Sequence, residues 1–519
     1  ENLYVAKLRL LSPDGKLLDE FLPQEFGFRE FWIDGRDFYL NGKKIHLRAL
    51  VSSHVRDTGK TSDEAIQHLV KTARDFGVNF LIGWNYDFAP GTFQYFRPFH
   101  TGTSKLGMLT SITLPHVKNF DMKMEDPAQA ARYRQYTEHL IRQYQNVPGV
   151  IMYVMNHNAM GYHGDQNPLK IGNDYKPEKY VKKMGNRPQA MIAEKIAKSI
   201  DTTRPVYHHE SGNLGDVFSI NCYLNWAPRQ ERSDWLENWE KTGTMPVIMV
   251  EWGMPHVASW SSWRGPAFIW RYAGLQCLWV DEFNASILGE DAYRSDDAKV
   301  FLSRHQEKLM KGNKETFFSQ LGGNSHLNRV EDVHRVRNYM VSRNFRHMRA
   351  RGISGLLPWD QFVAWSWVSG EPSQLNPDRF KNLKQPGIVL DNLRQGGEPI
   401  VNPYATFKLT TTGEAMKPNL QPEIGFVAGK IGDFTDPGHN FRPGEKVEKS
   451  LVILNDTRQV SKVPYRWSVP ELNISKSGEV EVAPGGRADV PVAFTIPADA
   501  AAGRLQLKAE FDFASGTVG

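Results

Sequence analysis

The 519-residue sequence predicts a multidomain protein in which a (β/α)8 TIM barrel is flanked by β-sandwich (immunoglobulin-like) domains. Three observations predict this fold class. Short alternating strands open the chain, eight apolar runs separated by helical stretches follow, and short strands between Pro/Gly turns close it. The expected domains are residues 1–36, 37–415 and 416–519, which agrees with the two to four cores that this length requires.

The first segment contains a β-hairpin signal. Asn2 to Leu10 alternates apolar and polar residues, Pro13-Asp14-Gly15 turns the chain, and a second run extends from Lys16 to Phe21. A hairpin alone cannot bury a core. We therefore expect residues 1–36 to be the C-terminal strands of a β-sandwich whose beginning is truncated.

The barrel begins after the turn signal Asn41-Gly42. Helices are expected between its strands, such as one that Ser62-Asp63-Glu64 opens and that runs to Phe76, and a long amphipathic one over Pro127 to Gln145. Alternating strands and helices form a parallel sheet, and eight such units close a barrel. The eight expected strands are Ile45–Ala49, Asn79–Gly83, Leu109–Leu114, Val150–Met155, Pro205–His209, Phe218–Cys222, Val247–Glu251 and Ile353–Pro358.

The connection between the last two barrel strands is far longer than an ordinary βα loop. We expect an insertion at about 255–350, with helical segments at Asp297 to Lys311 and Val330 to Arg349. Loops after barrel strands lie on the catalytic face. The insertion is therefore expected to build one wall of the active-site mouth, with a scaffold extension as the alternative.

From about Pro418 the pattern changes to Pro/Gly turns between alternating strands, which is typical of an immunoglobulin-like sandwich. We expect this sandwich to be incomplete at its C-terminus. The expected strands are Val447–Leu454, Val480–Val482, Ala488–Thr495 and Leu505–Phe513.

Composition excludes several classes of partner. The 63 basic and 58 acidic residues give a net charge of +5 without a long Lys/Arg run, so no nucleic-acid partner is expected. The sequence lacks a run of about 18 apolar residues, so no membrane partner is expected. Cys222 and Cys277 have no metal-ligand spacing, and we expect neither a metal nor a cofactor. The oligomeric state is left open.

One predicted strand ends on an ionisable residue. The run Pro246-Val-Ile-Met-Val-Glu251 places a carboxylate after four apolar residues, and Gly253 can turn the chain just beyond it. Catalytic side chains of TIM barrels lie at the carboxyl ends of strands, and a buried charge is costly unless it is paired or used. Glu251 is therefore the first catalytic candidate.

Glu251-Trp252-Gly253 resembles the nucleophile motif of glycoside hydrolase family 2 and its clan of (β/α)8-barrel retaining glycosidases. The resemblance covers residues 1–365, and further similar motifs occur in the family's order. These motifs are Phe26-Gly27-Phe28-Arg29, Phe38-Tyr39-Leu40-Asn41-Gly42, Leu47-Arg48-Ala49, Phe76-Gly77-Val78-Asn79-Phe80 and Asn146-Val147-Pro148-Gly149-Val150.

The resemblance implies an O-glycosyl hydrolase similar to β-galactosidases, β-glucuronidases or β-mannosidases. Such an enzyme cleaves β-linked sugars with retention, through a glycosyl-enzyme intermediate that here would form on Glu251. It also implies exo action on a polysaccharide or oligosaccharide and an extracellular or periplasmic location.

The strand-four motif departs from the family. The family's acid/base glutamate follows an asparagine there, but the run from Met152 to Asn158 contains no Glu. Alignment by the apolar residues places Asn158 at that position, and alignment by the asparagine places His157. Only the imidazole can transfer a proton, so His157 is the leading acid/base candidate. The alternatives are Glu210, Asp165 or a barrel that no longer hydrolyses.

Other strand ends supply candidates for a sugar pocket. By resemblance, Tyr223 would hydrogen-bond the nucleophile and Trp359 would lie under the sugar ring. The full set of substrate-binding candidates is His54, Arg56, Trp84, Asn85, Asp165, His209, Asn221, Tyr223, Trp359 and Asp360.

Two other functions fit parts of the sequence. A metal-dependent TIM-barrel hydrolase is suggested by histidines at strand ends, namely His54, His157, His208 and His209. However, His208 and His209 are adjacent in a strand, so only one of them can face the centre. A non-catalytic carbohydrate-binding barrel is the other alternative, but binding alone does not require Glu251.

Overall fold

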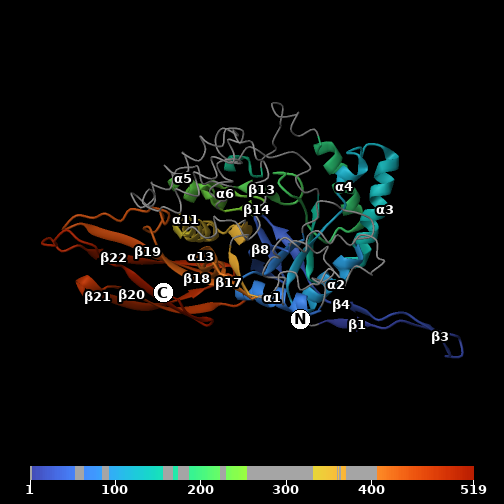
Figure 1. Cartoon of the computed structure of the whole chain (residues 1–519), viewed down its shortest axis with the longest axis horizontal. Helices are drawn as coiled ribbons and strands as arrows, with labels where there is room; N and C mark the ends of the chain where they lie inside the picture. The colour runs from blue at the N-terminus through green and yellow to red at the C-terminus, as the bar shows by residue number, and fades with distance from the viewer. Residues whose placement is uncertain are drawn as a thin grey trace.

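The computed structural model describes residues 3–52, 63–83, 93–155, 167–172, 186–222, 229–253, 331–358, 360–361, 364–369 and 406–518. Its centre is an eight-stranded parallel barrel in the order β12-β11-β10-β9-β8-β15-β14-β13 (Figure 1). The predicted (β/α)8 barrel is confirmed. Its strands are β8 (Leu47–Ser52), β9 (Phe80–Gly83), β10 (Leu109–Thr113), β11 (Val150–Met155), β12 (Val206–His208), β13 (Phe218–Cys222), β14 (Val247–Trp252) and β15 (Gly355–Pro358).

The barrel closes between β12 and β13 through the segment that joins them. Two antiparallel bridges, Tyr207 to Gly215 and Gly212 to Ser219, replace a direct strand pair. The Ser219 hydroxyl also accepts a hydrogen bond of 3.1 Å from the Ser211 amide. This segment follows the end of strand five directly and leads into strand six.

The helices surround the barrel, and the two helices predicted after its first and third strands are present as α1 and α3. In α3 (Pro127–Tyr144), Asp126 accepts from the Ala128 amide at 2.9 Å and Pro127 occupies the first position, a favourable helix start. The other helices are α1 (Asp63–Asp75), α2 (Phe93–Lys105), α4 (Arg187–Ile200), α5 (Arg229–Asp234), α6 (Glu237–Thr242), α11 (Glu331–Ala350) and α13 (Thr411–Leu420). No helix in the described ranges is long and apolar enough to cross a membrane.

The insertion predicted at about 255–350 ends in a helix that packs on the barrel. Helix α11 covers the predicted segment Val330–Arg349 and belongs to the barrel, because Val341, Phe345 and Met348 join its core. The Phe345 ring packs edge-on against Trp252 of β14, with centroids 4.6 Å apart. The predicted helix at 297–311 lies outside the described residues.

The barrel interior contains Leu47, Phe80, Val154, Ile248 and Leu357. A three-stranded antiparallel sheet packs against this interior. It consists of β5 (Phe31–Asp34), β6 (Asp37–Leu40) and β7 (Lys43–Ile45). Phe31, Phe38 and Leu40 from this sheet join the same core cluster. Two sequence assignments need correction here. Ile45 ends β7 and does not begin the first barrel strand, and the expected boundary at residue 36 falls in the β5–β6 turn.

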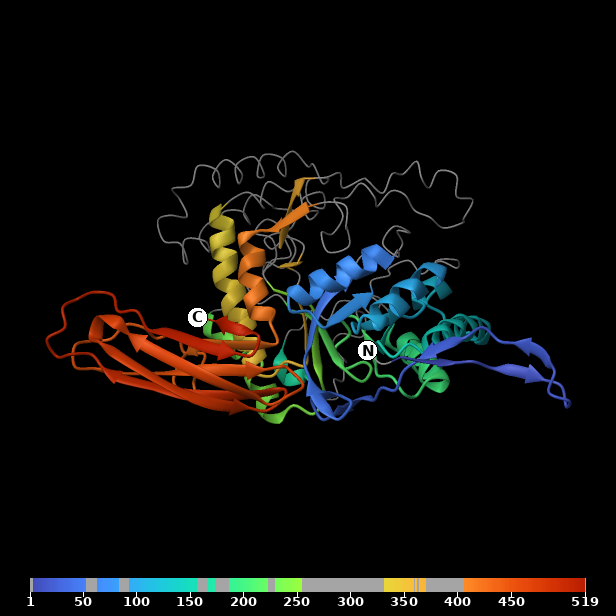
Figure 2. The same cartoon turned by 90° about the horizontal axis from the view of Figure 1, so that it is seen from below.

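The N-terminal strands form an arm beside the barrel. The predicted hairpin is present as β2 (Arg9–Leu11) and β3 (Leu17–Glu20), which Figure 2 shows projecting from the side opposite the C-terminal sandwich. The expected strand Asn2–Leu10 is divided, because β1 (Tyr4–Ala6) pairs with β4 (Gln24–Phe26) instead.

The C-terminal segment is a two-sheet antiparallel sandwich, as predicted. One sheet contains β18 (Glu423–Ala428), β19 (Lys446–Asn455) and β22 (Gly486–Thr495). The other contains β20 (Ser461–Val469), β21 (Ile474–Val482), β23 (Lys508–Phe513) and β24 (Gly516–Val518). Leu451, Trp467 and Phe511 pack in its core. Helix α13 continues past the expected boundary at residue 416 because its buried face, including Met416 and Leu420, packs on the barrel.

A buried ion cluster joins the barrel to the sandwich. Asp456, just after β19, accepts from His46 Nδ1 at 2.6 Å, Arg48 Nη1 at 3.0 Å and Arg349 Nη2 at 2.7 Å. Burial alone would raise the pKa of Asp456, but the charges of His46, Arg349 and Arg48 hold that pKa well below its ordinary value. The sandwich is thus bound to β8 and α11 of the barrel.

Candidate active site

Glu251 lies at the carboxyl end of β14 and is only 3% exposed. Its Oε1 is 3.4 Å from His209 Nε2, and the imidazole is equally buried. This distance is at the long end of the hydrogen-bonding range. The structure therefore places Glu251 at the carboxyl end of a buried barrel strand, one residue before its last, with a histidine from the end of strand five beside the carboxylate.

A β-bulge directs Glu251 away from the surrounding helices. Ile220 of β13 pairs with Met249, but the next residue, Asn221, pairs with Glu251, so β14 contains one extra residue. Val247, Met249 and Trp252 pack in the cluster that includes the helices, whereas Ile248 and Val250 pack in the barrel interior. If side chains alternated strictly after Met249, the side chain of Glu251 would point toward the helices. Because β14 contains one extra residue, the side chain of Trp252 points toward the helices instead.

Gly253 and Asp360 adjoin the strand end. Gly253 has a φ of +121°, and a Cβ at this position would lie 2.1 Å from Asp360 Oδ2. Only glycine tolerates both the backbone conformation and the close carboxylate. Asp360, which follows strand eight and is 1% exposed, is thus brought next to the Glu251 strand.

The two histidines of strand five face opposite directions, as predicted. His208 Nε2 is 3.2 Å from Glu194 Oε2 on α4, on the outside of the barrel, whereas His209 contacts Glu251. Burial lowers the pKa of His208, although Glu194 opposes this shift. Glu194 was not identified from the sequence. The only available signal was its i,i+4 spacing to Lys198, with which it forms a 2.9 Å ion pair.

Glu210 has a left-handed backbone with a φ of +57°, and its side chain is 1% exposed. Non-glycine residues adopt this conformation rarely, and such strain is concentrated at functional sites. Asn221, also 1% exposed, is the strand neighbour of Glu251. Four predicted site residues, Glu210, Asn221, Asp360 and His209, are therefore buried at the carboxyl ends of strands five, six and eight, and the last three adjoin the strand of Glu251.

The remaining predicted site residues lie outside the part of the chain that the structure describes. They are His54, Arg56, Trp84, Asn85, His157, Asn158, Asp165, Tyr223 and Trp359. Within the described ranges, no group of three His, Cys, Asp or Glu side chains has a geometry that could hold a metal ion.

The comparisons with known proteins agree with this fold. Residues 100–311 match the family model of the glycosyl hydrolases family 2 TIM barrel domain. No curated protein sequence gave a significant match. The β-D-mannosidase of Dictyoglomus thermophilum is 14% identical with a TM-score of 0.52, and the alignment covers 99% of this chain and 55% of that one. A complex of the Amycolatopsis orientalis exo-chitosanase is 12% identical with a TM-score of 0.50, with coverages of 99% and 53%.

The matched part of the barrel, residues 100–311, is similar to the TIM barrel domain of family 2 glycosyl hydrolases, in agreement with the sequence motifs. The chain spans about half the length of the solved structures that it matches. At these identities the structural likeness concerns the fold, so the activity of this chain has to be argued from its own residues.

Proposed function

We propose that the barrel hydrolyses β-linked glycosides with retention and that Glu251 is the nucleophile. The buried carboxylate at the carboxyl end of β14, directed away from the helices beside His209, carries this proposal. Catalytic groups of TIM barrels occupy such strand ends. A protein that only bound sugar would have no need of an ionisable group at this position.

The reaction has two steps that share one carboxylate. In the first step Glu251 attacks the anomeric carbon and forms a glycosyl ester while an acid protonates the departing glycosidic oxygen. In the second step the conjugate base of that acid deprotonates water, which attacks the anomeric carbon, breaks the ester bond and releases the sugar and the Glu251 carboxylate. We assign a positioning role to His209. A proton on its Nε2 would hold Oε1 of Glu251 and leave Oε2 for the attack.

The proton donor is proposed to be His157, with Glu210 as the rival. Within the strand-four segment Asn156 to Asn158, only the imidazole can donate and recover a proton. A neighbouring carboxylate such as Glu251 would favour the protonated imidazole. The strained backbone and burial of Glu210 support the rival assignment. Asp165 is the third candidate.

Exchange of Glu251 for Gln tests the nucleophile. Glu251→Gln should lower turnover by several orders of magnitude and leave the thermal unfolding midpoint nearly unchanged, because the ester cannot form. The exposed Glu237, which pairs with Lys241, provides a matched control, since Glu237→Gln removes an equivalent charge. An activated fluorosugar should label Glu251, and labelling of any other residue would refute the assignment.

Leaving-group dependence identifies the proton donor. His157→Ala and Glu210→Gln are compared on a natural glycoside and on an activated aryl glycoside, with azide as an external nucleophile. The true donor is the residue whose loss abolishes cleavage of the poor leaving group only and whose variant is rescued by azide on the activated substrate. If neither variant behaves in this way, the strand-four assignment is wrong and Asp165 is tested next.

We also propose exo action on an oligosaccharide or polysaccharide, with Trp359 under the sugar ring and Tyr223 hydrogen-bonded to the nucleophile. Trp359→Ala should mainly raise KM and Tyr223→Phe should mainly lower kcat. Exo action releases small sugars from the first turnover, which chromatography of early products detects. Unchanged kinetics in both variants would mean that the pocket is elsewhere.

A further inference from the structure

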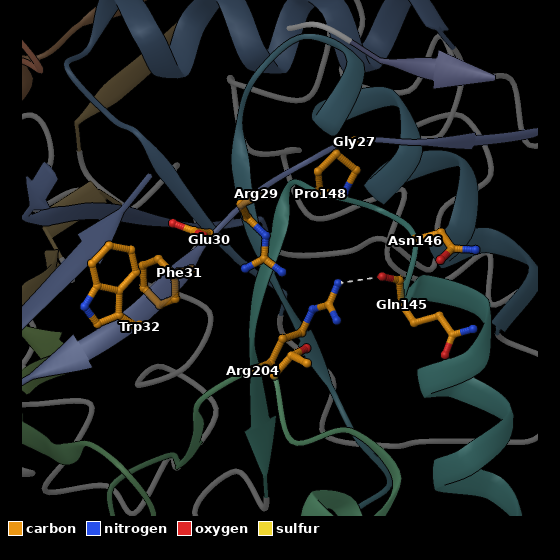
Figure 3. Close-up of a pocket in the computed structure, with 10 residues that line it drawn as sticks. Gly27, Arg29, Glu30, Phe31, Trp32, Gln145, Asn146, Pro148 and Arg204 are labelled. Carbon is orange, nitrogen blue, oxygen red and sulfur yellow. Dashed lines mark hydrogen bonds between the residues drawn. The ribbon is translucent and has the colours of Figure 1, made fainter. Parts of the chain in front are cut away.

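A cavity of about 590 Å³ lies at the opposite end of the barrel from Glu251 (Figure 3). Pro148 precedes β11 and Arg204 precedes β12, so this cavity faces the amino ends of the strands. Arg29 and Trp32, from the chain that enters the β5–β7 sheet, line its other side. Its volume is within the range of small-molecule sites.

Two donor atoms of Arg29 have no hydrogen-bond acceptor among the described residues. Its Nε and Nη1 are buried, and no residue in the described ranges accepts a hydrogen bond from either atom. Figure 3 shows the guanidinium pointing toward that of Arg204, with the Glu30 carboxylate directed away from both. Burial and the positive charge of Arg204 lower the pKa of Arg29 to about 10, so it remains charged at neutral pH.

The carboxylate of Asp201, which pairs with Arg204, is already fully engaged. Asp201 accepts from the Thr203 amide at 2.7 Å, the Thr203 hydroxyl at 2.6 Å, the Tyr153 hydroxyl at 2.6 Å and Arg204 Nη1 at 2.8 Å. These four donors use the acceptor capacity of one carboxylate. Asp201 therefore has no acceptor left for Arg29, and among the described residues Nε and Nη1 of Arg29 remain available to an external anion.

An aromatic surface lies at the edge of the same cavity. Trp32 is 38% exposed, and its ring stacks on Tyr39 of the next strand with centroids 5.4 Å apart and planes inclined by 13°. This stacking fixes the orientation of the indole and leaves one face for a ligand. An apolar ring face beside a charged group is the combination that a sugar bearing an acidic substituent requires.

We propose that this cavity is a non-catalytic binding site for an acidic sugar unit, whose carboxylate or sulfate group Arg29 holds while the sugar ring stacks on Trp32. The planar guanidinium matches the two oxygens of either anion. The site would hold a segment of an acidic polysaccharide away from the catalytic face. Binding there does not involve Glu251, so this proposal stands or fails separately from the proposed function.

Calorimetric titration of the chain carrying Glu251→Gln tests the proposal without turnover. The probes are a tetragalacturonate for the carboxylate, a κ-carrageenan tetrasaccharide for the sulfate, neutral cellotetraose, and sodium sulfate alone. At least one acidic oligosaccharide should bind with a Kd tenfold or more below those of cellotetraose and sodium sulfate. The acidic oligosaccharide with the lower Kd shows whether the site prefers a carboxylate or a sulfate group.

Variants then assign this binding to the cavity. Arg29→Gln should raise the Kd at least tenfold and Trp32→Ala at least threefold, whereas Arg466→Gln on the sandwich, which removes an exposed arginine, should leave it unchanged. The unfolding midpoint is measured with and without the oligosaccharide. Arg29→Gln should abolish the ligand-induced rise without lowering the midpoint of the free chain.

Three results would overturn the proposal. One is equal affinity for acidic and neutral oligosaccharides. Another is sodium sulfate binding as tightly as the sulfated sugar, which would indicate an anion site without a sugar. The third is an Arg29→Gln chain that unfolds at a lower temperature and yet keeps the full ligand-induced rise, since Arg29 would then serve the fold alone.

Discussion

Removal of the negative charge of Asp456 should loosen the sandwich from the barrel. Asp456→Asn keeps the size of the side chain but leaves Arg48 and Arg349, both buried, without their shared counter-ion. Loss of one partner from a buried ion pair costs about 3–5 kcal/mol, because the remaining charge is left unpaired. The lower figure corresponds to about two orders of magnitude in the unfolding equilibrium constant.

Differential scanning calorimetry measures this effect directly. For a domain of about 100 residues, about 3 kcal/mol lowers the midpoint by 10 °C or more. The transition assigned to residues 423–518 should shift by this amount at pH 7. Glu510→Gln is the matched control, since Glu510 forms an exposed pair with Arg466 and its loss should cost about 0.5 kcal/mol or less.

The pH dependence follows from the lowered pKa of Asp456. A carboxyl group whose pKa is lower in the folded state stabilises the fold above its unfolded pKa of about 3.9, and this stabilisation is lost as the pH falls toward the folded pKa. The difference between the wild type and Asp456→Asn should therefore be constant from about pH 5 upward and shrink below about pH 4. Equal midpoints at pH 7 would refute the reasoning.

Three further predictions concern the barrel mouth. Gly253→Ala should lower both activity and the unfolding midpoint, because the new Cβ meets Asp360 Oδ2 at a φ of +121°, and an active, equally stable variant would contradict this geometry. Glu210→Val should be less stable than Glu210→Asn by about 1–2 kcal/mol in urea denaturation, since asparagine tolerates the left-handed conformation and valine does not. His209→Phe should lower kcat more than it raises KM, because it removes the contact to Glu251, and a change in KM alone would assign His209 to substrate binding.

The sequence predicted the order of barrel strands because each strand is a short apolar run, and such runs are local. It also predicted that Glu251 ends strand seven and that His208 and His209 face opposite sides, since both follow from chain position and a period of two. The sequence did not show whether the helix at Val330–Arg349 packs on the barrel or belongs to the insertion alone. That helix belongs to the barrel only because Phe345 and its neighbours find partners far away in the chain.

The direction of the Glu251 side chain could not be predicted from the sequence either. Alternation along the strand assigns it to the helix side, and one extra residue in β14, visible only in its register with β13, reverses this assignment. The contacts of Asp456 likewise join residues separated by hundreds of positions. Which donors of Arg29 lack an acceptor in the described part of the chain depends on which neighbouring groups are already engaged. Thus the sequence by itself determined the fold class and the strand that carries the carboxylate, through local hydrophobic patterning. The tertiary structure alone decided which way that carboxylate points and which charges are neutralised, because both depend on register and on non-local packing.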